Sequence, residues 1–302
     1  MNFSPKIDSP SIYSLRGVGR TFGDGDRPSV ALQNITLDIP QGDQVVLLGP
    51  SGSGKTTLFR LLNASIFPSA GKLLYRTADV SSMGQADLRQ MRCRIGCIYQ
   101  QHYLVPGMSA LMNTLSGALG RWGIASTVRN LVTPKAAEVE RAEHCLEAVG
   151  LKEKWRSACS QLSGGQQQRL AIARTLMQQP EVILADEPVA SLDPVLSDEI
   201  LDLLVRLAED SHLTLLISLH QVELARRHSK RVVGLRTGEV AFDLPTSDLE
   251  EKSLTQLYHR SVKPHEPREL NEPHEQAARL PTLDPAGGPG GADDHQKRAC
   301  LR

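Results

Sequence analysis

The chain has 302 residues, 40% of them hydrophobic, which is enough apolar material for one large folded domain or two modest ones. Lysine plus arginine and aspartate plus glutamate each number 34, so the formal net charge is zero. This balance lacks the overall basic excess of a dedicated nucleic-acid-binding protein and leaves only a local basic patch open.

The order of apolar residues along the chain predicts an α/β domain. Residues 30–39 alternate between apolar and polar side chains, and the wholly apolar run QVVLL at 44–48 is typical of a buried parallel strand. Further strands are predicted at 72–76, 95–99, 182–185, 213–219 and 231–235, and helices at 55–63, 136–149, 165–178 and 194–209. Buried strands that alternate with helices indicate a doubly wound, mostly parallel sheet.

Two segments depart from this alternation. Residues 101–160 are mostly helical in pattern, with Pro134 at a helix start and Gly150 at a helix stop, which predicts an inserted helical subdomain. From about residue 262 the chain is rich in proline, glycine and charge. Such a segment buries too little apolar surface to offset its ordering entropy, so we expect a disordered tail.

Neither a secretion signal nor a membrane span is predicted. The N-terminal segment MNFSPKIDSPSIYSLRG has no apolar stretch followed by a small-residue cleavage site. The longest apolar run, LTLLISL at 213–219, is far shorter than the roughly 20 residues of a membrane helix. The five cysteines, at 93, 97, 145, 159 and 300, lack zinc-site spacing and indicate reduced thiols in the cytosol.

A glycine-rich loop follows the predicted strand at 44–48. Its sequence, GPSGSGKTT, fits the pattern G-x-x-x-x-G-K-[ST] between a strand and a helix. Successive backbone N–H groups of such a loop surround phosphates, the Lys55 ammonium reaches the β- and γ-phosphates, and the Thr56 hydroxyl can bind Mg²⁺. The predicted nucleotide-binding residues are therefore Gly49, Pro50, Ser51, Gly52, Ser53, Gly54, Lys55, Thr56 and Thr57.

Two carboxylates follow another buried strand, in the sequence EVILADEP. Ligands of open α/β sheets bind outside the carboxyl ends of the strands, where these acids would lie. Asp186 can then hold the Mg²⁺ shell, and Glu187 can orient or deprotonate a water molecule. A plain helix cap would also explain this sequence, so its catalytic interpretation depends on the glycine-rich loop.

The segment QLSGGQQQR, about twenty residues before these acids, is the third distinctive element. Ser163, Gly164 and Gly165 precede an apolar helical pattern, so their N–H groups lie at a helix N-terminus, where the macrodipole favours an anion. Two glycines and three glutamines are not needed for a stable core. The segment is therefore predicted to bind a phosphate without a lysine of its own.

Together these elements resemble the nucleotide-binding subunits of ATP-binding cassette (ABC) transporters, whose signature motif is LSGGQ, over about residues 12–258. The resemblance implies an α/β fold with a P-loop NTPase core and parallel sheet, an N-terminal antiparallel β subdomain and an inserted helical subdomain. The domains expected from it are an extension at 1–11, an ABC ATPase domain at 12–261 with its helical subdomain at about 101–175, and the tail at 262–302.

The resemblance also implies that two subunits share each nucleotide. In this family the signature residues, here Ser163, Gly164, Gly165 and Gln166, bind the γ-phosphate of ATP held by the opposite subunit. Asp193, in the sequence ASLDP, is expected to reach across the same dimer interface.

Three further site residues are expected from the family pattern. Phe22 is the expected aromatic that stacks on adenine, with Tyr13 as its competitor. Gln100, in IYQQ, is expected to contact Mg²⁺ and water and to link to the membrane subunits, although the adjacent Gln101 leaves the register open. His220 follows the strand at 213–219, where it would meet the γ-phosphate and act in catalysis.

The resemblance implies ATP and Mg²⁺ as cofactors and a homodimer, since every catalytic element is present in this one chain. The implied partners are transmembrane permease subunits and a periplasmic solute-binding protein, with no nucleic acid, at the cytoplasmic face of the inner membrane. An export ATPase stays open. A DNA-repair or translation ATPase is disfavoured because the chain has neither coiled-coil heptads nor a second P-loop.

Segments outside the shared motifs resemble the ATP-binding subunits of phosphonate importers. These are NTLSGALGRW at 113–122, the long stretch between Gln100 and the signature, 218–243 and LTQLYH at 254–259. The resemblance implies ATP-driven import of phosphonates or related phosphorus oxyanions, with phosphite, phosphate or another small oxyanion left open as the solute.

Overall fold

The structure is a computed structural model that describes residues 10–23, 28–122, 126–127, 129–130 and 133–258. The tail expected at 262–302 lies outside the described residues. Residues 1–9 of the expected N-terminal extension also lie outside them. Ser11, which was assigned to that extension, is the first residue of a strand. No helix within the described ranges combines the length and the apolar character that crossing a bilayer requires.

The smaller of two sheets is antiparallel and forms the expected N-terminal β subdomain. Its strands lie in the order β2 (Ser29–Pro40), β1 (Ser11–Phe22), β4 (Ala70–Tyr75) and β5 (Ala78–Asp79). The strand predictions at 30–39 and 72–76 are confirmed to within one or two residues. Its inward residues, among them Ile12, Leu15, Ile35 and Leu37, form one apolar cluster with α1 (Lys55–Leu62).

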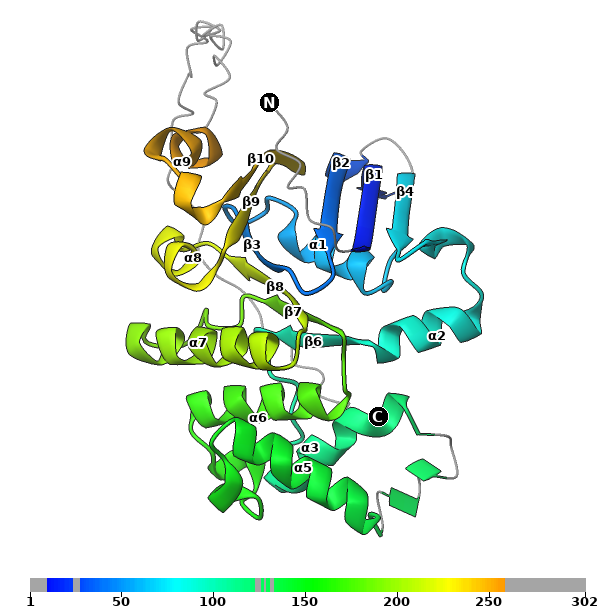
Figure 1. The fold of residues 1–302 in the computed structure, drawn as a ribbon, viewed down its shortest axis with the longest axis vertical. Helices are drawn as coiled ribbons and strands as arrows, with labels where there is room; N and C mark the ends of the chain where they lie inside the picture. The colour runs from blue at the N-terminus through cyan, green and yellow to red at the C-terminus, as the bar shows by residue number, and fades with distance from the viewer. Residues whose placement is uncertain (1–9, 24–27, 123–125, 128, 131–132, 259–302) are drawn as a thin grey trace, which may run out of the picture. The chain divides into compact units, whose positions relative to one another are not determined.

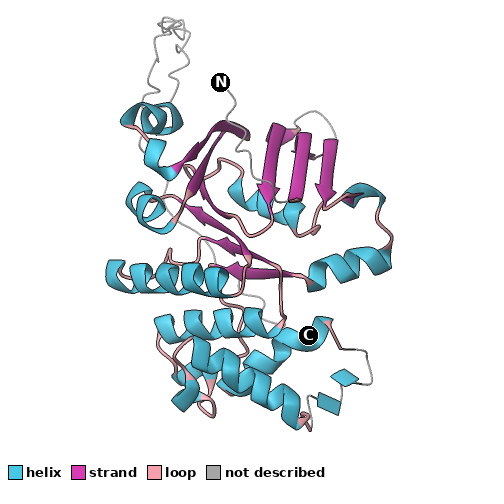
Figure 2. Cartoon of the chain, in the orientation of Figure 1, coloured by secondary structure: helices cyan, strands magenta, loops and turns pink. Residues whose placement is uncertain are grey.

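The larger sheet has six strands, and five of them are parallel (Figure 2). The order is β10 (Glu239–Pro245), β9 (Arg231–Arg236), β3 (Gln44–Leu48), β8 (Thr214–Leu219), β7 (Val182–Asp186) and β6 (Ile95–Tyr99), with β10 antiparallel at one edge. Strands β3 and β8 are buried at every position, which explains their continuous apolar sequences. The predicted parallel sheet is therefore confirmed.

Helices enclose this sheet and also form a separate group beside it (Figure 1). The helices α7 (Pro194–Asp210), α8 (Val222–His228) and α9 (Glu251–Tyr258) belong to the sheet region. The group consists of α3 (Ala110–Ser116), α5 (Ala136–Ala148) and α6 (Gly164–Met177), which contact one another. Short 3₁₀ turns are η1 (Val80–Ser82), η2 (Gly117–Gly120), η3 (Lys152–Lys154), η4 (Cys159–Gln161) and η5 (Thr246–Asp248).

The helical group corresponds to the inserted subdomain that the sequence predicts. Helix α6 contacts both α7 and β6, so it connects this group to the sheet. Its C-terminal neighbour Gln178 strengthens that connection, because its Nε2 donates to the carbonyls of Arg92, Cys93 and Ile95 at 2.9, 3.1 and 2.9 Å. The carbonyls of Arg92 and Cys93 lie in the last turn of α2 (Gln85–Cys93), where carbonyls lack helical partners, and the Ile95 carbonyl lies at the start of β6.

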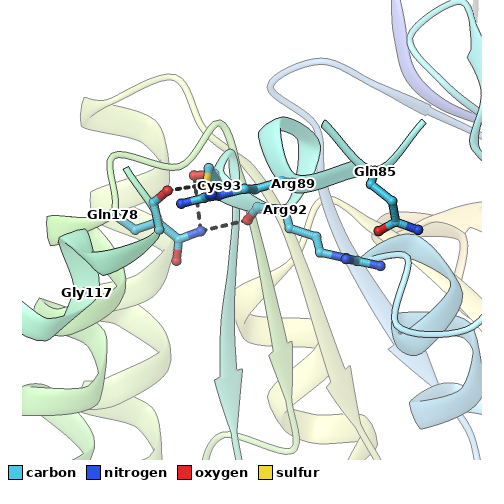
Figure 3. A pocket seen from close by; sticks show the side chains of 7 residues that line it. Gln85, Arg89, Arg92, Cys93, Gly117 and Gln178 are labelled. Atoms are coloured by element: carbon cyan, nitrogen blue, oxygen red, sulfur yellow. Dashed lines mark hydrogen bonds between the residues drawn. The ribbon is translucent and has the colours of Figure 1, made fainter. Parts of the chain in front are cut away.

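A surface cavity marks this junction (Figure 3). It has a volume of about 510 Å³, and its lining includes Arg89, Arg92 and Cys93 of α2 and Gln178 after α6. The Cys93 thiol donates to the Gly120 carbonyl at 3.0 Å across it. The cavity is separate from the residues predicted to bind nucleotide, so the candidate site must be sought at the strand ends.

Candidate functional site

The carboxyl ends of four neighbouring parallel strands bring the predicted site residues to one edge of the large sheet. Strand β3 ends before the loop at 49–54, β8 before His220, β7 at Asp186 and β6 before Gln100. In the sheet register Asp186 pairs with Ser218 of β8 and with Tyr99 of β6. The clustering that the sequence predicts from strand ends is therefore present in the structure.

The loop between β3 and α1 has the backbone shape of a phosphate cradle. Gly52 and Gly54 have positive φ angles of 78° and 107°, and the Ser53 N–H donates to the Pro50 carbonyl at 3.2 Å. A Cβ added to Gly54 would lie 2.8 Å from the Ala31 carbonyl oxygen, so a side chain does not fit there. The buried Ser53 Oγ has no hydrogen-bond partner among the described residues, as expected for a group that a bound phosphate satisfies.

The Lys55 ammonium turns back over this loop. Nζ donates to the carbonyls of Gly49 and Pro50 at 2.8 and 3.1 Å and lies 3.7 Å from Oε1 of Glu187. The side chain is only 5% exposed, and this burial lowers the pKa of Lys55, while the carboxylates of Glu187 and Asp186 partly offset the effect. The ammonium thus lies at the centre of the loop, where phosphate oxygens would meet it.

Ser218 organises the two carboxylates. Its Oγ donates to Oδ1 of Asp186 at 2.6 Å and accepts the backbone N–H of Glu187 at 2.9 Å. Glu187 has a φ of 47°, in the left-handed region that side chains other than glycine seldom adopt. The serine therefore helps to hold a strained turn, in which the Asp186 and Glu187 side chains have different contacts.

The carboxylate of Glu187 lies between two cationic or potentially cationic groups. Oε1 is 3.7 Å from Lys55 Nζ, and Oε2 is 3.9 Å from Nδ1 of His220. His220 is half-exposed, and its backbone carbonyl accepts the Tyr258 hydroxyl at 3.0 Å. A small cavity of about 10 Å³, comparable to one water molecule, is lined by Glu187, Ser218 and His220 among others.

The predicted metal ligands are distributed over two neighbouring features. Thr56 and Asp186 line one cavity of about 350 Å³ together with Tyr99. Gln100 follows Tyr99, and both Gln100 and Gln101 are exposed, so the structure does not decide between them. No cluster of three or more His, Cys, Asp or Glu side chains suited to a metal occurs in the described part of the chain. One carboxylate and one hydroxyl still fit Mg²⁺, which keeps several waters and takes substrate phosphate oxygens.

The signature residues begin α6, as the sequence predicts. Ser163 is the N-cap: its Oγ accepts the Gln166 N–H at 3.3 Å, and Gln166 Oε1 accepts the Ser163 N–H at 3.0 Å. Gly164 is exposed, and a Cβ there would meet nothing within 4 Å. Gly165 is buried, and a Cβ there would collide with Leu196 of α7. The first glycine therefore leaves space open, and the second allows the two helices to approach.

Asp193 has the structural role that its position before a proline predicts. Its Oδ1 accepts the Leu196 N–H at 3.0 Å and caps α7, and the side chain is exposed. The same turn contacts Gly165, so Asp193 lies near the signature residues of its own chain. Its predicted contact with a second subunit stays a prediction.

The two aromatic candidates for adenine differ in exposure. Tyr13 is fully buried and donates its hydroxyl to the Leu62 carbonyl at 3.0 Å, so it is not available for stacking. Phe22, at the end of β1, is partly exposed, and the Arg20 guanidinium lies 4.7 Å from its ring centre. Phe22 is therefore the candidate that remains.

Sequence reasoning missed Ser218. The signal was the hydroxyl of Ser218 near the end of the mostly apolar run LTLLISL, in the strand next to the one that precedes the two acids. A buried polar side chain requires a partner, and here the partners are the site carboxylate and the amide that follows it.

Comparison with known proteins agrees with this geometry. The family model described as ABC transporter matches residues 32–190, which is more than half of the chain. This chain belongs to the ABC transporter family. The match extends from β2 through the phosphate loop and the signature to the two carboxylates, so these three elements lie within the matched ABC transporter region. This membership confirms the family and fold that the sequence predicts.

Curated relatives of this ABC transporter family member include several proteins named Phosphonates import ATP-binding protein PhnC. The one from Frankia casuarinae is 43% identical over 252 residues, which cover 83% of this chain and 97% of the relative. The one from Shouchella clausii is 41% identical over 264 residues, covering 87% and 97%. A third, from Anaeromyxobacter dehalogenans, is 42% identical over 92% of this chain, and the chain spans about half (53%) of that relative's length.

Solved structures support the same fold. The dimeric ATP-binding cassette MJ0796, described in a post-hydrolysis state bound to ADP and Pi, has a TM-score of 0.66 and 31% identity, covering 78% of this chain and 98% of that one. The structure of cbiO1 from Clostridium perfringens, part of the ABC transporter complex cbiONQ, has a TM-score of 0.70 and 25% identity, covering 82% and 94%.

Proposed function

We propose that this chain is the ATP-hydrolysing subunit of an ABC importer for phosphonates or closely related phosphorus oxyanions. The observation that carries the proposal is the combination of two facts. The predicted Lys55, Glu187 and His220 lie together at one sheet edge and the signature residues begin α6, and relatives named for phosphonate import are 41–43% identical over more than four fifths of the chain.

The loop at 49–57 and Phe22 would bind the nucleotide. The backbone N–H groups and Ser53 Oγ would surround the phosphates, and Lys55 would move from the Gly49 and Pro50 carbonyls to the phosphate oxygens. Phe22 would stack on adenine. Thr56, Asp186 and Gln100 would hold Mg²⁺, which supplies positive charge to the β- and γ-phosphate oxygens.

Glu187 is placed to accept a proton from water. In the structure its carboxylate lies 3.7 Å from the Lys55 ammonium, which stabilises its charge. Phosphate competes for that ammonium, and the carboxylate oxygen would then be available for the proton of the attacking water. His220, on the other side of Glu187, would orient this carboxylate and the γ-phosphate.

A second copy of the chain would complete the site. The start of α6 offers the N–H groups of Gly164 and Gly165 and the hydroxyl of Ser163, which together fit a γ-phosphate held by another subunit. Ser163 to Gln166 and Asp193 would therefore act across a homodimer. Hydrolysis removes the phosphate bridge between the subunits and so lets the dimer open.

The expected partners are transmembrane permease subunits and a periplasmic solute-binding protein, with no nucleic acid. Through the permease, this chain would lie at the cytoplasmic face of the inner membrane. The competing functions are import of another solute and export, because the ATPase domain alone does not set the direction of transport.

Growth and transport measurements test the proposal. A strain that lacks this chain should fail to grow on phosphonate or phosphite as sole phosphorus source, and restoring the chain should restore growth. The companion solute-binding protein should bind these compounds. Unchanged uptake of all of them, a companion selective for sugars or amino acids, or co-purification with a permease that has no binding protein would contradict the assignment.

A further inference from the structure

The loop after Gln100 is tied to the signature helix by one arginine. Arg174 lies near the C-terminal end of α6, ten residues after Gly164, which is about 15 Å along the helix. Its Nη2 donates to the His102 carbonyl at 2.7 Å, and its Nη1 donates to the Tyr103 carbonyl at 2.6 Å. Two separate nitrogens of one guanidinium therefore hold two consecutive carbonyls.

This contact is not an ordinary ion pair. Arg174 forms no ion pair with a carboxylate among the residues that the structure describes, and burial lowers the pKa of its guanidinium. A half-buried cation without a counter-ion is costly unless its donors are satisfied, and here backbone carbonyls satisfy them. The backbone of α6 is also closely packed at this residue, because a Cβ at Gly117 would overlap the Arg174 carbonyl oxygen.

The held segment is strained and has a second anchor. Tyr103 has a φ of 48°, so the loop needs outside contacts to keep this shape. Two residues further on, the Val105 N–H donates to Oδ1 of the buried Asn113 at 2.9 Å, and Asn113 Nδ2 donates to the Val105 carbonyl at 3.1 Å. Residues 102–105 are therefore fastened to α3 and α6 of the helical group.

Only two residues separate this fastened segment from the large sheet. Strand β6 ends at Tyr99, and Gln100 and Gln101, between the strand and His102, are exposed and form no side-chain hydrogen bond with another residue of the described ranges. The position of Gln100 at the predicted Mg²⁺ site is thus set from one side by β6 and from the other by the Arg174 contact.

We propose that Arg174 is a positioning residue that fixes Gln100 relative to the signature helix, so that the metal end of one nucleotide site and the phosphate end of the other move together. The proposal rests on the proposed ATPase function for its kinetic consequences. The fastening of residues 102–105 is a property of the chain itself and can be measured without activity.

The test compares Arg174→Ala and Arg174→Lys with the control Gln178→Ala in the full chain. Gln178 also connects α6 to the sheet region, through two hydrogen bonds to the end of α2 and one to the start of β6, but it has no hydrogen bond to residues 100–105. We measure kcat and KM for ATP, the Mg²⁺ concentration needed for half-maximal rate, and amide hydrogen exchange over residues 100–106.

Arg174→Ala is expected to lower kcat roughly tenfold or more, because small misplacements of site groups are costly, while KM for ATP changes by less than about twofold. The half-maximal Mg²⁺ concentration should rise, and exchange over 100–106 should accelerate. Arg174→Lys keeps the charge without the planar fork, so it should restore less than about half of the lost rate. Gln178→Ala should lower the melting temperature but leave kcat within about twofold.

Each of three results would overturn the proposal. The first is that the wild type is active and Arg174→Ala has the same kcat, and the second is that hydrogen exchange over 100–106 is unchanged in both Arg174 variants. The third is that Gln178→Ala shows the same kinetic defect as Arg174→Ala. If Arg174→Ala does not fold, the proposal is tested with Arg174→Lys alone, by its hydrogen exchange over 100–106 and its half-maximal Mg²⁺ concentration. A wild-type chain without ATPase activity would instead contradict the proposed function, and the exchange measurement would still test the fastening.

Discussion

The helices α1 and α6 both begin at glycine-rich turns. They differ in how many anion-binding groups lie close to the start of the helix. At the start of α1 the buried Lys55 ammonium, the carboxylates of β7 and an unpaired serine hydroxyl converge. At the start of α6 none of the residues from Ser163 to Gln166 is charged, and Gly164 faces open space.

The difference shows which half of a nucleotide site one chain can form alone. The α1 site has charge, burial and preformed backbone, so it should bind nucleotide without a partner. The α6 site has only backbone amides and the helix dipole, whose contribution at an exposed end is about 0.3–1 kcal/mol. It should therefore act only on a phosphate that another molecule presents.

The largest effect is expected from Glu187→Gln. The amide cannot accept the proton of water, so kcat should fall by roughly a thousandfold while nucleotide binding persists. Size-exclusion chromatography with ATP and Mg²⁺ should then show a dimer that the wild type forms only transiently. The matched control is Glu181→Gln, which removes a carboxylate bonded to Tyr75 and Arg76 away from the site and should leave kcat within about twofold. Substantial hydrolysis by Glu187→Gln would remove this residue from its role.

Lys55→Ala should abolish tight nucleotide binding. Loss of the ammonium leaves phosphate charge uncompensated in a partly buried loop, and we expect affinity to fall roughly a hundredfold. Titration with a fluorescent ATP analogue measures this. Lys152→Ala, which breaks an exposed pair with Glu147, is the control and should bind as the wild type does. Equal affinity in the two variants would show that the α1 site does not depend on its lysine.

Substitutions at Gly164 test the α6 site separately. Gly164→Asp places a carboxylate where the partner's phosphate would lie, and it should prevent ATP-dependent dimer formation and lower kcat more than tenfold through charge repulsion. Gly164→Ala is the matched control, because the added Cβ meets nothing within 4 Å. Binding of nucleotide to the monomer should be unchanged in both. Dimer formation by the Asp variant would contradict the proposed contact.

The smallest effect concerns the connection between α7, which Asp193 caps, and α8, which follows His220. His228 is buried, with Nε2 2.8 Å from Asp198 Oδ1 and Nδ1 3.1 Å from Asp202 Oδ1, and Arg227 also contacts Asp198 at 2.7 Å. The His228 hydrogen bond and the Arg227 charge lower the pKa of Asp198 from its ordinary value of 3.8. The resulting stabilisation is complete above pH 3.8 and is lost as pH falls through the lower, folded-state pKa.

Asp198→Asn should therefore melt slightly below the wild type at pH 7, and the difference should shrink as the pH falls below about 3.8. Melting curves at a series of pH values measure this. A difference that stays constant into the acid range would show that the carboxylate charge does not stabilise the contact.

The sheet was predictable from sequence, but several elements around it were not. The strands at 44–48, 95–99 and 213–219 are mostly apolar and agree with β3, β6 and β8 to within a residue. Strand β1 was missed as a strand, because Gly17 and the register shifts beside it interrupt its alternation. Helix α2 was missed because only Leu88 and Met91 are buried, which leaves no apolar stripe to recognise.

The site was predictable as a set of residues but not as a geometry. Strand ends place Asp186, Glu187 and His220 together, and the motif names Lys55. The left-handed backbone of Glu187 and its support by Ser218 depend on the neighbouring strand, about thirty residues away in sequence, so local pattern does not reveal them. The short helices α8 and α9 were also absent from the prediction, and α3 was predicted only as part of the helical segment 101–160, without bounds of its own.

The reciprocal cap at the start of α6 has a consequence for the crowded ionic interior of a cell. Because Ser163 and Gln166 already satisfy each other's N–H groups, the donors left for a dissolved anion among the described residues are the amides of Gly164 and Gly165 and the Ser163 hydroxyl. Inorganic phosphate and free nucleotide therefore gain little by settling there. The start of α6 therefore stays unoccupied in a background of competing anions. It should bind only a phosphate that is already held by a complementary protein surface.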